Sequence, residues 1–140
     1  MPNSPEDAFC TEWATRPSVL ATVPISSFFI GMVPLVDEAD TTELQPPFAT
    51  IRESTIQTVE RTNENQLIQA IWILELSAVR YKEAKELALA CIDEFSRIGF
   101  TWDRGTVADM KLESQAEPQD ADGLWKIAQT WLVTYSLDPA

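Results

Sequence analysis

Two long segments in which apolar and polar residues alternate constrain the fold of this chain more than any other feature. They run from Gln66 to Val79 and from Leu124 to Leu137, on either side of one helical segment. Successive side chains of a β-strand point to opposite faces, so an alternating strand has one face on a core and the other on solvent or a partner. The two segments therefore predict a sheet that is covered on one side.

The segment from Gln66 to Val79 carries apolar residues on both of its faces. The predicted core face consists of Ala70, Trp72, Leu74 and Leu76. On the opposite face Ile71 and Ile73 stand among polar residues. Strongly apolar residues at such positions indicate burial against something outside the domain, such as a second subunit. We expect a subunit interface that contains Ile71, Ile73, Glu75 and Arg80, with Glu75 or Arg80 making charge-assisted contacts at its edge.

The segment from Tyr81 to Ile98 is predicted to be an amphipathic helix. Its apolar residues recur with the spacing of a single helical stripe, at Ala84, Leu87, Ala88, Cys91, Ile92 and Phe95. Gly99 is the expected end of this helix, because glycine enters the left-handed cap conformation without steric cost. We interpret the stripe as part of the core.

The remaining elements follow from caps, turns and shorter patterns. Ser4 is the expected cap of a first helix, which Pro17 interrupts, and the range 27–33 is predicted to be a strand. The range 48–60 should form a hairpin with the strand that begins at Gln66, and the range 107–113 a hairpin with the strand that begins at Leu124. This order predicts one α+β domain over residues 1–140, with an antiparallel sheet of about four to five strands and helices packed on one face.

A long acidic segment, from Asp37 to Pro47, lies before the first predicted hairpin. Its acidic residues repel one another and precede two prolines, which predicts an exposed, extended loop. The four acids are Asp37, Glu38, Asp40 and Glu43.

Charge and hydropathy exclude several classes of protein. The chain has 22 acidic and 10 basic residues, a net charge of −12. Proteins that hold nucleic acid or an anionic membrane need clustered Lys and Arg, so we expect neither kind of binding. An acidic surface would let DNA slide past without sticking, although the charge is equally well explained as a source of solubility. No apolar run reaches the roughly 20 residues of a membrane-spanning helix, and Met1 to Asp7 is unlike a signal peptide.

The sequence holds few candidate catalytic or metal-binding groups. It has no histidine, which removes the Ser-His-Asp and Cys-His arrangements and the usual zinc sites. Cys10 and Cys91 are far apart and are interpreted as small apolar side chains. Asp120, Asp122 and Gly123 carry part of a calcium-loop pattern, but the later glutamate ligand is missing, so a plain hairpin turn is favoured. We expect no metal and no cofactor.

Three stretches carry a resemblance to a known family. They are PPFATI at Pro46 to Ile51, which leads into a long hairpin, the helix start at Tyr81 to Ala84, and WKIAQTWLVTY at Trp125 to Tyr135. Together with the order of elements, they resemble the tail terminator or tail completion proteins of tailed bacteriophages. The resemblance spans nearly the whole chain, and its motifs contain no catalytic signature.

The resemblance implies a virion structural protein that is not an enzyme. Members of that family have an α+β fold and assemble in the host cytoplasm as rings, commonly hexamers. The ring stops the growing tail tube at its head-proximal end and offers a surface to the head-tail connector, and DNA passes through it. The implied partners are other copies of the chain, the tail tube protein and the connector or neck protein, and no membrane.

The acidic segment at Asp37 to Pro47 departs from typical members of the family. We interpret its acids as a docking loop for the tube or the connector. Two alternatives to a tail terminator stay open from the sequence. One is a neck or head-closure connector, which shares the size and the ring assembly. The other is a small enzyme that acts through carboxylates and a divalent metal.

Overall fold

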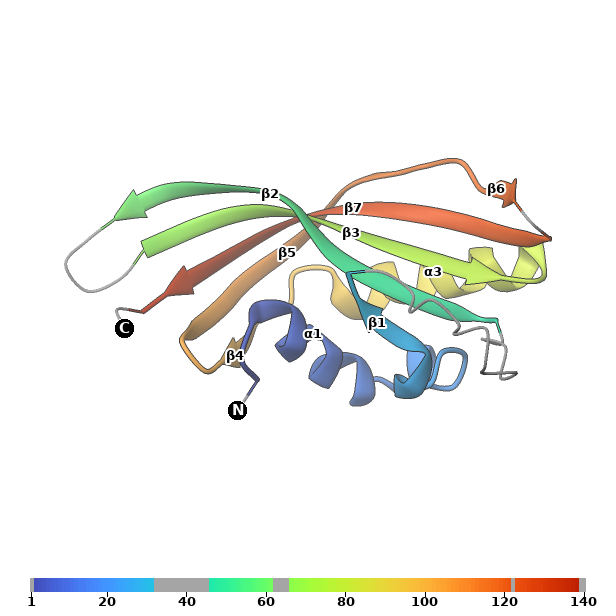
Figure 1. Cartoon of the computed structure of the whole chain (residues 1–140), viewed down its shortest axis with the longest axis horizontal. Helices are drawn as coiled ribbons and strands as arrows, with labels where there is room; N and C mark the ends of the chain where they lie inside the picture. Colours follow the sequence, from blue (N-terminus) through green and yellow to red (C-terminus); the bar gives the residue numbers. More distant parts are fainter. Residues whose placement is uncertain (1, 32–45, 62–65, 122, 139–140) are drawn as a thin grey trace, which may run out of the picture.

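The computed structural model of this chain describes residues 2–31, 46–61, 66–121 and 123–138 (Figure 1). Its helical elements are α1 (Pro5–Ala14), α2 (Pro17–Leu20), the short 3-10 helix η1 (Ile25–Ser27) and α3 (Tyr81–Phe95). Its strands are β1 (Phe28–Ile30), β2 (Phe48–Arg61), β3 (Gln66–Ala78), β4 (Phe100–Trp102), β5 (Gly105–Gln115), β6 (Gln119–Ala121) and β7 (Leu124–Leu137).

The strands form one curled, mixed sheet in the order β1-β2-β3-β7-β5-β4, with β6 added beside β7. β1 pairs with β2 in parallel, and the other pairs are antiparallel. The prediction of an α+β domain with an antiparallel sheet of four to five strands and a helical face is therefore wrong: the fold is mostly sheet, with few helices. Three strands of three residues each are too short to leave an alternating pattern in the sequence.

The helices lie on one side of the sheet and leave part of it uncovered, because the end of the β2–β3 hairpin extends past them (Figure 1). We call the face that carries Trp72 and Trp131 the inner face, and the opposite one the outer face. Both tryptophans are fully buried. The inner face packs against α1 and α3 around an aromatic cluster, whose members from the helices are Phe9, Trp13 and Phe95.

Helix α1 begins where its capping residues predict. The Oγ of Ser4 accepts a hydrogen bond from the backbone N–H of Asp7 at 3.1 Å, and Pro5 occupies the first helical position. Pro17 does more than interrupt α1, since it begins the separate helix α2. The indole N–H of Trp13 donates to the carbonyl of Val23 at 2.9 Å, which fixes the chain between α2 and β1 against α1.

Helix α3 buries the predicted stripe except for Ile92, which is half-buried, and it ends earlier than predicted, at Phe95. The left-handed residue after it is Arg97, with φ of 64°, and not Gly99. Arg97 is held there by its backbone N–H, which donates to the carbonyl of Met110 at 2.7 Å, and by an ion pair to Asp109 at 2.9 Å. Tertiary contacts with β5 therefore set the end of the helix.

The long strands pair with different regularity. β3 and β7 are antiparallel without a register shift over the whole length of β3. The β2–β3 pair has shifts between Glu53 and Thr55 and between Thr58 and Glu60, which bend and twist β2. Asp120, which was predicted to lie in a plain hairpin turn with Gly123, belongs to β6, which pairs with the start of β7. Gly123 has a φ of 77°.

Candidate interaction surface

The structure places three of the predicted interface residues side by side on the outer face of β3. Ile71, Ile73 and Glu75 are half-buried and alternate with fully buried residues of the inner face. Arg80 lies apart from them, exposed at the start of α3. The period-2 pattern thus located the face correctly for the strand residues, but it could not tell where the chain turns after β3.

The neighbouring strands add residues to this face that the sequence analysis did not single out. In the sheet, Leu132 of β7 lies opposite Ile71, and Arg52 of β2 lies opposite Ile73. Lys111 of β5 lies opposite Leu132 on its other side. We call Ile71, Ile73 and Leu132 the outer patch. It is a small apolar group with an exposed basic residue on each side.

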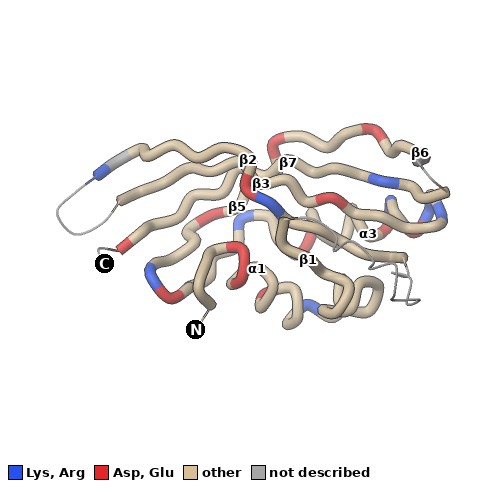
Figure 2. Tube along the Cα trace, in the orientation of Figure 1, with Lys and Arg blue, Asp and Glu red and all other residues tan. Residues whose placement is uncertain are grey.

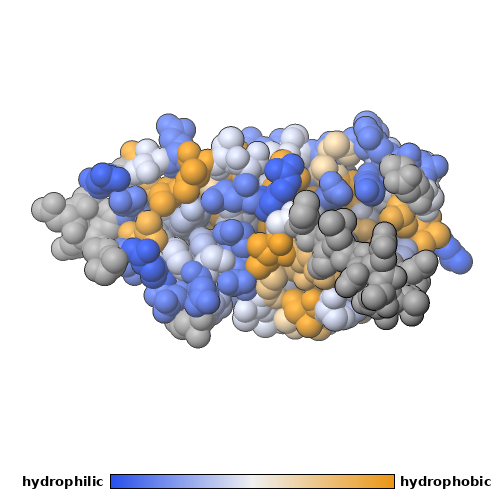
Figure 3. Space-filling view, in the orientation of Figure 1, coloured by the Kyte–Doolittle hydropathy of each residue, from blue (hydrophilic) through white to orange (hydrophobic). Residues whose placement is uncertain are grey.

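The outer patch also has charged neighbours. In the described part of the chain, neither Arg52 nor Lys111 forms an ion pair with an acid. Figure 2 shows acids and bases distributed along both halves of the molecule, and Figure 3 shows hydrophobic residues in patches between hydrophilic ones. The charges around the outer patch are of both signs, with Glu75 next to Ile73 on β3.

A pocket of about 190 Å³ lies at the Glu75 end of the outer face. It is lined by Glu75, Ala116, Glu117, Gln119, Lys126 and Ala128. Glu75 lies opposite Ala128 in the sheet, and the segment between β5 and β6 forms the far wall. The lining thus combines charges of both signs, from Glu75, Glu117 and Lys126, with the methyl groups of two alanines.

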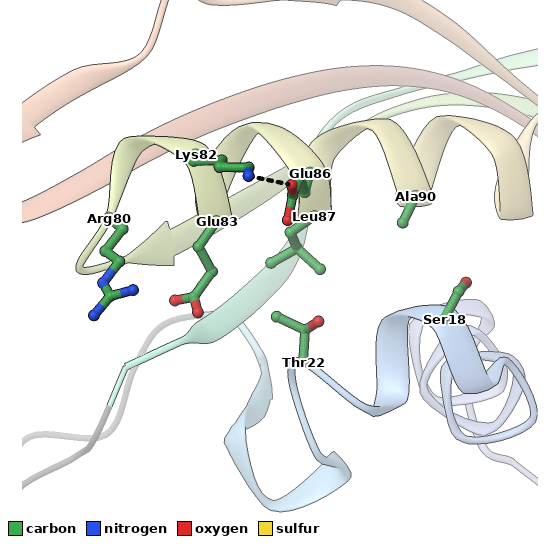
Figure 4. Close-up of a pocket in the computed structure, with 8 residues that line it drawn as sticks. All are labelled: Ser18, Thr22, Arg80, Lys82, Glu83, Glu86, Leu87 and Ala90. Carbon is green, nitrogen blue, oxygen red and sulfur yellow. Dashed lines mark ion pairs between the residues drawn. The ribbon is translucent and has the colours of Figure 1, made fainter.

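A larger pocket, of about 470 Å³, lies between α2 and α3 (Figure 4). Its lining comes from Ser18 and Thr22 on one side and from α3 and its cap on the other: Arg80, Lys82, Glu83, Glu86, Leu87 and Ala90. Lys82 and Glu86 form an exposed ion pair at 3.8 Å. The side chains are of mixed charge and do not form a nucleophile with a positioned base.

The inner face contains a hydrogen-bonded carboxylate. Glu53 accepts from the indole N–H of Trp72 at 3.3 Å and from the hydroxyl of Tyr135 at 3.1 Å. Burial and the nearby Glu53 charge raise the pKa of Tyr135, and burial raises the pKa of Glu6. The phenol therefore stays protonated at neutral pH, and the arrangement acts as a structural tie between β2, β3 and β7.

The two thiols are unsuited to nucleophilic chemistry. Cys10 is half-buried and Cys91 is buried in the core, and both are free. Burial raises the pKa of Cys10 to about 12 and also raises the pKa of Cys91. A thiol that remains protonated is a poor nucleophile and a poor metal ligand. Among the described residues, no group of three or more His, Cys, Asp or Glu could hold a metal ion.

One structurally important residue was missed by the sequence analysis. Gln129 of β7 is fully buried on the inner face, between Ile127 and Trp131. Its amide N–H groups donate to the carbonyl of Ala88 at 3.0 Å and to Gln115 at 2.9 Å, and its oxygen accepts from the indole of Trp131 at 3.1 Å. Alternation along β7 places residue 129 on the inner face with Ile127 and Trp131. A polar residue at an inward position was the signal in the sequence that could have identified Gln129.

The other predicted site residues, Asp37, Glu38, Asp40 and Glu43, lie outside the described residues. Of the helices that the structure describes, none has the length and apolar character needed to cross a membrane.

Comparison with solved structures finds a similar fold. The fold is similar to that of a chain in the virion of native gene transfer agent (GTA) particle, with a TM-score of 0.76. The match covers 95% of this chain and 95% of that chain, at 9% sequence identity. No known protein family and no curated protein matches the sequence. At this identity the likeness concerns the fold.

Proposed function

We propose that this protein is a structural component of a phage-like virion, and that within the virion it is a tail terminator. The observation that carries the proposal is the fold shared with a component of the GTA particle over nearly the whole of both chains. The narrower role rests on the resemblance of Pro46 to Ile51 and Trp125 to Tyr135 to tail terminator proteins. The virion is the expected location.

In this role, copies of the chain form a ring, with six copies as the expected number, at the head-proximal end of the tail tube. The ring ends tube growth and offers a surface to the head-tail connector. Ile71 and Ile73 are proposed to be buried between neighbouring copies, with Glu75 or Arg80 at the edge of that interface. Asp37, Glu38, Asp40 and Glu43 are proposed to dock to the tube or connector. The net charge of −12 favours passage of DNA without retention.

A cryo-EM map of the particle tests the location. We expect a ring of this chain at the upper end of the tail tube, and tails without heads when the gene is deleted. A ring in contact with the portal and separated from the tube would show that the chain is a neck or head-closure connector and not a tail terminator. A map without this chain at either position would overturn the virion role at the tail.

The double variant Ile71→Asp with Ile73→Asp tests the interface. Both side chains lie on the outer face, so the isolated protein should stay folded while particles show abnormal tails without heads attached. The control is Thr101→Asp with Ala108→Asp, which adds the same charge at exposed positions of β4 and β5. Normal tails from the Ile71 and Ile73 variant would refute the interface, whatever the result for location.

A further inference from the structure

We draw no further inference here: the strongest candidate, the edge of β2 beyond its pairing with β1, where Ile56 and Val59 are exposed, carries nothing because nothing in the described residues shows what covers it.

Discussion

Replacing Gln129 by methionine should cost much of the stability that holds α3 on the sheet. Methionine has a similar length and fits without a large cavity, so the main loss is hydrogen bonding. The indole N–H of Trp131, buried beside Gln129, loses its acceptor at 3.1 Å, and the carbonyl of Ala88 loses a donor at 3.0 Å. An orphaned buried donor costs about 1–3 kcal/mol and a lost neutral hydrogen bond about 0.5–1.5 kcal/mol.

These contributions sum to a loss of about 2–4 kcal/mol in the free energy of unfolding, or roughly 5–15 °C in melting temperature. Chemical and thermal unfolding, followed by tryptophan fluorescence, measure both quantities. Gln115→Ala is the matched control, because Gln115 is half-buried and its loss leaves the bonds to Ala88 and Trp131 intact. The control should cost less than about 1 kcal/mol.

A double-mutant cycle isolates the orphaned indole. Trp131→Phe removes the donor that Gln129→Met leaves without a partner, so the double variant should lose less stability than the two single variants added together, by about 1–2 kcal/mol. A cost below about 0.5 kcal/mol for Gln129→Met would refute the assignment of stability to this hydrogen-bond network. A double variant whose loss equals the sum of the two single losses would refute it as well.

Three further predictions follow from local geometry. Gly105→Ala should cost about 3 kcal/mol or more in unfolding measurements, because a Cβ there would lie 1.9 Å from the carbonyl oxygen of Ser136; a small cost would show that β5 and β7 can separate freely. Burial raises the pKa of Glu6 in the fold, so the wild type should lose stability relative to Glu6→Gln as the pH rises through that pKa; parallel melting curves for the two proteins would contradict this. Cys10, with a pKa of about 12, and Cys91 should react slowly with thiol reagents at neutral pH until the protein is unfolded; rapid labelling of the native protein would refute the burial argument.

Long periodic elements could be predicted from the sequence because their signal is local. β3, β7 and α3 each extend over more than ten residues, and their faces follow from period 2 or 3.6. β4 and β6 have three residues each and owe their pairing to neighbouring strands. β1 joins the sheet in parallel with β2, which no pattern within β1 specifies. The number of strands, and with it the fold class, depended on such short elements.

The difference between local patterns and strand pairing also explains which parts of the candidate interface could be predicted. Alternation within β3 placed Ile71 and Ile73 on one face without any knowledge of the neighbouring strands. Their contact with Leu132 depends on the β3–β7 register, which joins residues about sixty positions apart. Arg52 likewise comes beside Ile73 only through the β2–β3 register, which contains two shifts. A sequence pattern gives the direction of a side chain, and only the sheet gives its neighbours.

The small size of the outer patch bears on how the proposed ring would assemble. Ile71, Ile73 and Leu132 are already half-buried in the single chain, so contact with a neighbour removes only part of their surface from water. Stable protein–protein contacts bury about 1,600 Å² in total, and a contact centred on three such side chains is weak for a single pair. In a closed ring on a tube end, each copy contacts two neighbours and the tube. These simultaneous contacts raise the effective concentration of each copy beside its neighbours, so that weak pairwise contacts are sufficient. A chain that is monomeric in dilute solution and ordered into a ring only on a finished tube is therefore the behaviour that these surfaces favour.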